Sequence, residues 1–263
     1  MSRPSIFITG AATGIGRATA QHFHRGGWCV GLYDVNEAGV RELAVSLGEG
    51  ALAGKLDVTD AAGMAAALES FFDAAGGRLD VLFNNAGIAV VGDFDALPLP
   101  RQLALVDVNL KGVIIGCHAA FPYLKRTPGS RVISMSSASA IYGAPGFASY
   151  CATKFAVKGL TEALNIEWDK HGIRCMDVLP LFVDTPMVTQ FVEQSGGKPK
   201  SMDALGMHLT ADDIAATVWR AVNWRWWPRI HWYPGAQSWL LALSSKVSPG
   251  WFNHLSTKWV SGY

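Results

Sequence analysis

The stretch TGAATGIG at residues 9–16 decides the fold of this chain. It follows the apolar run 5–9 and leads into RATA at residues 17–20, so a strand, a glycine turn and a helix occur in order. Glycines let a backbone approach a pyrophosphate, and the N-terminus of the following helix offers free N–H groups. The stretch therefore predicts a dinucleotide-binding turn, whose contacting residues are Gly10, Thr13, Gly14, Ile15 and Gly16.

Apolar runs alternate with helical stretches along most of the chain. The predicted strands are 5–9, 28–34, 51–57, 79–84, 131–136 and 174–180, and the predicted helices are 15–25, 39–47, 61–75, 101–125 and 150–171. This alternation predicts an α/β fold with a doubly wound parallel sheet of the Rossmann type. We expect one domain over residues 1–263. Within it, residues 182–210 should form an irregular substrate loop with a short helix, and residues 234–263 a Trp-rich C-terminal extension.

Composition excludes several classes of protein. The 263 residues include 22 basic and 21 acidic side chains, and this near balance argues against bulk binding of nucleic acid. The four cysteines form no C-x-x-C pair and the histidines show no metal-ligand spacing, so neither a metal nor a disulfide framework is expected. The N-terminus lacks a signal-peptide pattern, and no apolar run approaches 18 residues. We therefore predict a cytoplasmic protein.

A carboxylate ends the predicted second strand. Asp34 lies 18 residues after Gly16, where it can accept hydrogen bonds from an adenosine ribose and repel a 2′-phosphate. This position favours NAD over NADP, although a simple strand-end cap is an alternative. Asp57 and Val58 end the third predicted strand, where they contact adenine or merely cap a helix.

Polar motifs follow the later strands. NNAG at residues 84–87 lies at the predicted carboxyl edge of the sheet, where its amides can brace a loop. In YCATK at residues 150–154, the four-residue step places Tyr150 and Lys154 on one helical face, about 6 Å apart along the axis. An ammonium there can lower the pKa of the phenol from its usual value near 10 toward neutrality. Such a tyrosine is a general acid and base for alcohol and carbonyl interconversion.

Together, these motifs resemble the short-chain dehydrogenase/reductase family over residues 4–235. The resemblance implies that Tyr150 is the acid/base, that Ser137 orients the substrate oxygen and that Lys154 also grips the nicotinamide ribose. Asn109 matches an asparagine of the family that holds a water-linked proton relay. Without the resemblance, Asn109 is an ordinary polar residue of a helix. Strand alternation would point Ser136 and Ser137 to opposite faces, and only the thirteen-residue spacing to Tyr150 selects Ser137.

The resemblance also implies cofactor contacts after the fourth and sixth strands. Family members commonly carry Pro-Gly followed by Val-x-Thr, whereas this chain reads PLFVDT at residues 180–185, with Leu181 in place of the glycine. That change affects backbone freedom and the pocket wall. The implied contacts are Asn85, Ala86, Gly87, Tyr150, Lys154, Pro180, Val183 and Thr185.

The expected activity is NAD-dependent interconversion of a secondary alcohol and a ketone. A lipophilic substrate, such as a steroid-like, acyl or bulky aromatic molecule, fits the apolar residues of the predicted substrate segments, namely Ile141, Tyr142, Phe147, Met187, Phe191, Met202 and Met207. Two alternatives remain. One is a 3-oxoacyl thioester reductase of lipid metabolism, and the other is a non-catalytic protein that senses NAD(H).

Eight of the ten tryptophans fall in the last 45 residues, at positions 219, 224, 226, 227, 232, 239, 251 and 259. Three interpretations stay open. The first is core packing or the interface of a homodimer or homotetramer, since the family is usually oligomeric. The second is a cap over the substrate pocket. The third is weak contact with a membrane surface through WRWW at 224–227 and the segment 239–243, which mix aromatic and cationic residues.

Overall fold

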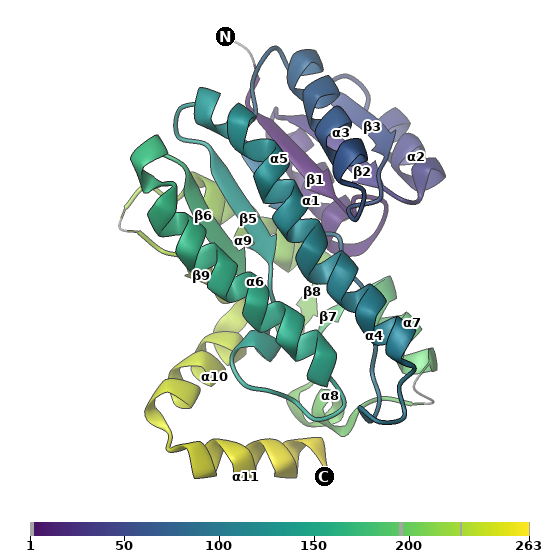
Figure 1. The fold of residues 1–263 in the computed structure, drawn as a ribbon, viewed down its shortest axis with the longest axis vertical. Helices are drawn as coiled ribbons and strands as arrows, with labels where there is room; N and C mark the ends of the chain where they lie inside the picture. The colour runs from purple at the N-terminus through teal and green to yellow at the C-terminus, as the bar shows by residue number, and fades with distance from the viewer. Residues whose placement is uncertain (1–2, 195–196, 227, 263) are drawn as a thin grey trace.

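The computed structural model of the chain describes residues 3–194, 197–226 and 228–262 (Figure 1). Its centre is a seven-stranded parallel sheet in the order β3-β2-β1-β4-β5-β6-β9. The strands are β1 (Ser5–Thr9), β2 (Cys29–Asp34), β3 (Ala51–Lys55), β4 (Val81–Asn84), β5 (Arg131–Met135), β6 (Arg174–Val178) and β9 (His231–Trp232). The predicted doubly wound parallel sheet is confirmed. Its order reverses between β1 and β4, which is where open sheets of this kind bind ligands.

Helices cover both faces of the sheet. They are α1 (Gly14–Arg25), α2 (Glu37–Leu47), α3 (Ala61–Ala74), α4 (Leu99–Val106), α5 (Gly112–Arg126), α6 (Ala148–Glu167) and α9 (Ala211–Asn223), with the short helices η1 (Asp107–Lys111), η2 (Ala138–Ala140) and η3 (Asp169–His171). In β1, Ile6 and Ile8 pack in one core with α1, α2 and α9, whereas Phe7 packs in a second core with α3 and α5. Burial on both faces explains why the strands are continuous apolar runs.

The long helical segment from α4 through η1 to α5 spans residues 99–126. It is long and apolar enough to cross a membrane by length and composition alone. In the structure it packs along α3, α6 and the sheet, and Leu105, Ala120 and Leu124 are fully buried. It therefore serves as a core helix of the α/β fold. The π-helical turn η1 interrupts it and carries Asn109.

Strand β9 was missed at the sequence level because it is only two residues long and lies in the Trp-rich tail. It extends the sheet by pairing His231 with Asp177 and Trp232 with Val178 of β6. His231 Nδ1 lies 2.7 Å from Asp177 Oδ1, and His231 Nε2 lies 3.0 Å from Glu162 Oε1. Burial raises the pKa of Asp177, while the hydrogen bond from His231 acts in the opposite direction. The imidazole between two carboxylates thus anchors the edge strand.

The segment 182–210 is more ordered than the irregular loop with one short helix that we expected. It contains two helices, α7 (Pro186–Gln194) and α8 (Lys200–Leu205). Its two ends are joined where β7 (Val183–Asp184) pairs in parallel with β8 (Leu209–Thr210). This pairing brings the two ends of the segment together, so residues 185–208 form a closed loop that projects from the sheet.

The last part of the chain forms the helices α10 (Gly235–Val247) and α11 (Gly250–Ser261). Figure 1 shows them in yellow at the end of the molecule opposite the N-terminus. The tryptophans divide between two environments. Trp219 packs edge-to-face on Phe23 with ring centroids 5.0 Å apart, and Trp232 is buried. Trp239, Trp251 and Trp259 are exposed, and Trp227 lies outside the described residues.

Candidate active site

A cavity of about 760 Å³ opens at the carboxyl ends of the strands, within the size range of small-molecule sites. It is walled by the turns after β1, β2, β4, β5 and β6, by α7 and by the C-terminal helices. The predicted site residues that line it are Gly10, Thr13, Gly14, Ile15, Asp34, Asn85, Ala86, Gly87, Ser137, Tyr150, Lys154, Pro180, Val183 and Thr185. Gly16, Asp57, Val58 and Asn109 lie outside this lining.

The glycine turn requires its glycines. Gly10 and Gly14 have φ angles of +69° and +53°, in the left-handed region that side chains disfavour. A Cβ on Gly16 would lie 2.1 Å from the carbonyl oxygen of Gly10, so α1 can approach the turn only without a side chain there. Thr13 precedes α1 but makes no capping hydrogen bond with its side chain. The first N–H groups of α1 are therefore available to an anion.

The NNAG motif braces this turn, as its amides suggested. Asn85 Nδ2 donates hydrogen bonds to the carbonyl oxygens of Thr9 and Gly10, at 2.9 and 3.0 Å. The Thr9 hydroxyl oxygen accepts from the backbone N–H groups of Asn85 and Ala86, both at 3.1 Å. These bonds tie the end of β4 to the end of β1 and hold the turn in one conformation.

Asp34 lies against the glycine turn in the cavity wall. Its Oδ2 accepts from the Ala12 N–H at 3.0 Å, and its Oδ1 accepts from the Asn36 N–H at 2.9 Å. Among the described residues that line the cavity, Lys154 is the one cationic side chain, and it belongs to α6. The turn therefore carries an acid without a neighbouring lining cation, an arrangement that suits ribose hydroxyls better than a 2′-phosphate.

Asp57 has a local partner instead. Its Oδ1 accepts from the N–H and the hydroxyl of Thr59, at 2.9 and 2.8 Å, and these bonds lower its pKa. These bonds form a local turn before α3, whose N-cap is Asp60, so the helix-cap alternative for Asp57 is wrong. Val58 is buried against Gly112 of α5. Contact of either residue with adenine stays a prediction.

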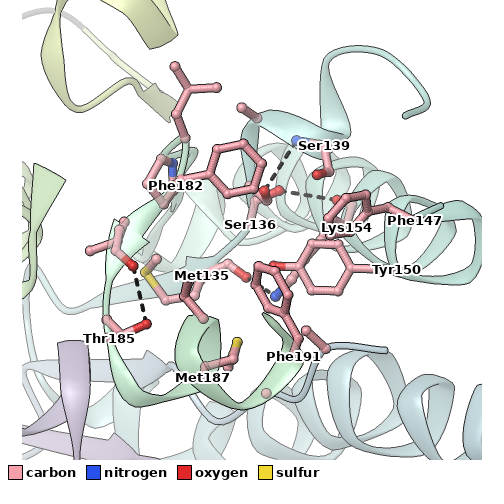
Figure 2. A pocket seen from close by; sticks show the side chains of 18 of the residues that line it. Met135, Ser136, Ser139, Phe147, Tyr150, Lys154, Phe182, Thr185, Met187 and Phe191 are labelled. Atoms are coloured by element: carbon pink, nitrogen blue, oxygen red, sulfur yellow. Dashed lines mark hydrogen bonds between the residues drawn. The ribbon is translucent and has the colours of Figure 1, made fainter. Parts of the chain in front are cut away.

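Tyr150 and Lys154 of α6 lie beside Met135 and Ser136 at the end of β5 (Figure 2), and Ser137 lines the same cavity. The Ser137 side chain lowers the pKa of Tyr150 against the effect of burial, and its Oγ accepts a hydrogen bond from the Ser139 N–H at 3.2 Å. Lys154 Nζ lies 5.4 Å from the centre of the Tyr150 ring and donates to the Met135 carbonyl at 2.8 Å. The Ser136 hydroxyl donates instead to the Lys154 carbonyl oxygen at 3.1 Å. The effect on the pKa of Tyr150 comes from Ser137, the serine that the thirteen-residue spacing selects, and its role toward the substrate stays a prediction.

Burial dominates the titration of this pair. It raises the pKa of Tyr150 to about 12, while the hydrogen bond with Ser137 acts in the opposite direction. Burial also lowers the pKa of Lys154 to about 8. The expectation that the pKa of Tyr150 falls toward neutrality is therefore wrong for the protein without ligand. Loss of hydration disfavours both charged forms more than their mutual attraction favours them.

Asn109 is buried in η1 and holds a loop rather than facing the cavity. Its Oδ1 accepts from the Ile88 N–H at 2.8 Å, and its Nδ2 donates to the Ile88 carbonyl at 2.9 Å. The same Nδ2 lies 3.5 Å from the hydroxyl oxygen of Thr153, the residue before Lys154. Asn109 thereby links the loop after β4 to α6. A π-turn at this point is typical of functional helices.

Leu181 fits where the family commonly has glycine. Among the described residues no side-chain-bearing residue has a positive φ, so the backbone at Leu181 does not need glycine. Leu181 lines the cavity and adds an apolar side chain to its wall. Thr185 reaches the glycine turn, since a Cβ on Gly14 would lie 3.5 Å from the Thr185 Cβ.

The rest of the cavity wall was predicted only in part. Tyr142, Phe147, Met187 and Phe191 line the cavity, whereas Ile141, Met202 and Met207 do not. Lining residues that were not predicted individually include, from α10 and α11, Ser244, Ser245, Phe252, Asn253, Ser256, Thr257 and Val260. Their position agrees with the second interpretation of the Trp-rich extension, a cap over the pocket. The recurrence of 253, 256, 257 and 260 at helical spacing is the signal that could have found them.

Other chemistry finds little support in the described residues. No group of three or more His, Cys, Asp or Glu side chains among them could hold a metal ion. The four cysteines are buried and free, and burial raises the pKa of each thiol. A raised pKa reduces the reactive thiolate fraction. The Tyr150 hydroxyl and the Lys154 amine are the lining groups with shifted pKa values, about 12 and about 8.

Comparisons agree with this geometry. Residues 4–196 match the family model described as short chain dehydrogenase. The chain is 32% identical over 214 residues to meso-2,3-butanediol dehydrogenase of Serratia marcescens, covering 81% of this chain and 84% of that protein. It is 32% identical over 215 residues to cyclohexanol dehydrogenase of an Acinetobacter species, covering 80% and 84%.

A solved structure is also similar. The 3-ketoacyl-(acyl-carrier-protein) reductase of Brucella melitensis, complexed with NADH, matches with a TM-score of 0.76 and 29% identity over 83% of this chain and 90% of that one. The chain belongs to the short-chain dehydrogenase/reductase family. It is an oxidoreductase of the alcohol dehydrogenase and ketone reductase type.

Proposed function

We propose that the chain is an NAD-dependent dehydrogenase that interconverts a lipophilic secondary alcohol and its ketone. The observation that carries this proposal is the placement of Ser137, Tyr150 and buried Lys154 in the same cavity as the glycine turn and Asp34, with Lys154 Nζ 5.4 Å from the centre of the Tyr150 ring. The turn fits a dinucleotide because a Cβ on Gly16 would meet backbone and the N-terminus of α1 has no side-chain cap.

The proposed roles follow from the contacts. NAD, when bound, supplies the nicotinamide carbon that accepts or returns hydride. Ser137 binds and orients the substrate oxygen, and the Tyr150 hydroxyl oxygen takes the alcohol proton in oxidation and returns it in reduction. Lys154 stabilises the phenolate and holds the ribose. Because burial raises the pKa of Tyr150, oxidation should be favoured at alkaline pH, where a larger fraction is phenolate.

The glycine turn, Asp34, residues 85–87 and the loop after β6 are proposed to hold the cofactor. Asn109 is proposed to support the proton path by fixing the loop at Ile88. The predicted homodimer or homotetramer and the cytoplasmic location remain proposals, supported by the family resemblance and by the composition.

Asp34 offers a test of cofactor preference. Replacing it with serine removes the carboxylate beside the Ala12 N–H, which would otherwise accept from ribose hydroxyls and repel a 2′-phosphate. We expect KM for NAD to rise about 10- to 100-fold, the range of a lost charged hydrogen bond, and KM for NADP to fall. Steady-state kinetics with both cofactors measure this. The control Glu37→Gln removes an exposed acid of α2 that pairs with Arg41, and should leave both KM values unchanged. An unchanged NAD-to-NADP ratio in Asp34→Ser would contradict the assignment.

The proposed substrate class rests on the wall near Tyr150. The rings of Phe182 and Phe191 lie 6.4 and 6.0 Å from that of Phe147, and Leu181 and Met187 add further apolar surface. The relatives named for 2,3-butanediol and cyclohexanol are consistent with secondary alcohols. A bulky apolar substrate would bury this surface, which contributes about 25 cal/mol for each Å² removed from water.

The experiment is NADH formation near pH 9 across hydroxysteroids, 3-hydroxyacyl thioesters, bulky aryl alcohols, cyclohexanols and small polyols, an alkaline pH chosen because oxidation needs the phenolate. We expect kcat/KM to be at least about 10-fold higher for one bulky lipophilic class than for polyols, as burial of a few methylene groups predicts. A preference for small polyols would overturn the lipophilic assignment while preserving the dehydrogenase.

A second candidate is a 3-oxoacyl thioester reductase, which the likeness to the Brucella melitensis enzyme favours. Reduction of a 3-oxoacyl thioester with NADH, faster than any ketone in the panel, would select it. The remaining alternative is the NAD(H) sensor. NADH binding without turnover of any substrate would favour that sensor, although nothing in the site geometry requires it.

A further inference from the structure

The helices α10 and α11 each have one side that faces the cavity and an opposite side that faces away from it. Each turns one side to the cavity, where Ser244 and Ser245 of α10 and Ser256 and Thr257 of α11 are among the lining residues. Asn253 Nδ2 of α11 donates to the Ser245 carbonyl at 3.2 Å and joins the two helices. The inner sides thus carry several hydroxyl and amide groups together with Leu241, Phe252 and Val260, and they already have a place in the fold.

The opposite sides are apolar and exposed. We define the outer face as the seven residues Trp239, Leu240, Leu243, Val247, Trp251, Leu255 and Trp259, which recur at helical spacing. Trp259 is 82% exposed, Val247 74% and Trp251 66%. An amphipathic helix of a water-soluble protein normally turns its apolar side inward, so this pattern is reversed. A large exposed apolar surface marks an interaction site.

The charges near the outer face indicate whether a second copy of the chain or an anionic surface covers it. Residues 214–263 contain no Asp or Glu, whereas they contain Arg220, Arg225, Arg229, Lys246 and Lys258. Lys246 and Lys258 are exposed on the same two helices as the outer face. A second copy of the chain packed symmetrically on this face would bring lysines together without any acid from these helices to pair with them. An anionic surface has the complementary charge.

Tryptophan supports the same occupant. Its ring is apolar and its N–H is polar, so it is enriched where hydrocarbon meets water in membranes. Amphipathic helices with Trp and Leu on one side and Lys nearby lie in that interfacial plane and bind anionic lipids. We infer that the outer face of α10 and α11 binds the surface of an anionic lipid bilayer, leaving the inner sides to wall the cavity.

This inference is independent of the proposed reaction, because binding to lipid needs no turnover. Its test is co-sedimentation of the full chain with vesicles of phosphatidylcholine alone or with about one third phosphatidylglycerol. We expect binding to the anionic vesicles that falls with added salt. The triple variant Trp251→Ser, Leu255→Ser, Trp259→Ser should bind at least about 10-fold more weakly, since it loses most of the apolar anchor. NADH affinity should be unchanged, because none of the three residues lines the cavity.

A charge variant separates the two contributions. Lys246→Glu with Lys258→Glu should weaken binding to anionic vesicles by more than about 5-fold per lysine, the factor expected for each charge removed near the surface, and leave the weak binding to neutral vesicles unchanged. The matched control is Val45→Ser with Phe94→Ser, which removes apolar side chains that are 84% and 63% exposed elsewhere on the molecule. It should bind lipid like the parent chain.

Three results would overturn the inference. The parent chain fails to sediment with anionic vesicles, the triple variant binds them as well as the parent, or the control variant loses as much binding as the triple variant. Analytical ultracentrifugation adds a fourth. If the triple variant dissociates an oligomer of the parent chain, the outer face is covered by a second copy instead of lipid.

Discussion

Tyr150→Phe should lower kcat for alcohol oxidation by roughly 100- to 10,000-fold, the range for a lost general acid and base. Phenylalanine keeps the ring that lies 6.3 Å from the Phe147 ring and 5.4 Å from Lys154 Nζ, so packing is retained. Only the hydroxyl is lost, the group whose pKa burial and Ser137 set. NADH affinity, followed by fluorescence, should change less than about 3-fold because the glycine turn is untouched.

The chain contains a matched control for this experiment. Tyr142 also lines the cavity and belongs to the loop between η2 and α6, away from the pair formed by Ser137 and Tyr150. Tyr142→Phe removes the same atom from the same cavity and should retain kcat within about 3-fold, an effect typical of a residue outside the proton path. Near-normal turnover by Tyr150→Phe, or an equal loss in both variants, would remove Tyr150 from its proposed role.

Gly16→Ala should have the second largest effect. The added Cβ would lie 2.1 Å from the Gly10 carbonyl oxygen and 2.7 Å from Asn85 Nδ2, so α1 or the glycine turn must move. Such overpacking costs about 1–3 kcal/mol of unfolding free energy. Displacement of the turn should weaken NADH binding by more than about 10-fold, since phosphate contacts depend on N–H groups at fixed positions. Thermal unfolding and NADH titration measure the two effects separately.

Gly159→Ala is the control for glycine replacement in a helix. Gly159 is exposed in α6, and a Cβ there would meet nothing within 4 Å. Because alanine favours helix over glycine, the variant should be stabilised by up to about 1 kcal/mol and bind NADH normally. If Gly16→Ala were equally harmless, close approach of α1 to the turn would not be what the glycine provides.

Sequence reasoning succeeded where local pattern and burial agree. Six strands were predicted because strands covered on both faces are continuous apolar runs, and their bounds were within two residues of the structure. The geometry of the glycine turn and of the helix that contains Tyr150 could be predicted from residue spacing alone. Spacing selected Ser137, and in the structure its side chain lines the cavity with Tyr150 and lowers the pKa of Tyr150 against the effect of burial.

The features that sequence analysis did not predict have one physical cause. They depend on contacts between residues far apart in the chain, which leave little signal in the local sequence pattern. Strand β9 depends on pairing with β6 and on the contact of His231 with Asp177. A cap formed by the Trp-rich extension was among the interpretations, but the residues of α10 and α11 that line the cavity depend on where those helices pack, and the polar ones resemble a solvent-facing stripe. The pKa of Tyr150 reverses the expected direction because spacing reveals its neighbour Lys154 but not the loss of hydration.

The packing of α1 on α9 has a consequence for synthesis of the chain. Phe23 and Trp28, near the beginning, are covered by Trp219, with ring centroids 5.0 and 6.1 Å apart. On the ribosome, this apolar surface stays uncovered until almost 200 later residues have emerged, during seconds of translation. The first helix is complete early, yet its native partner arrives among the last. Nascent chains should therefore depend on chaperones, and truncations that remove α9 should aggregate rather than fold to a smaller domain.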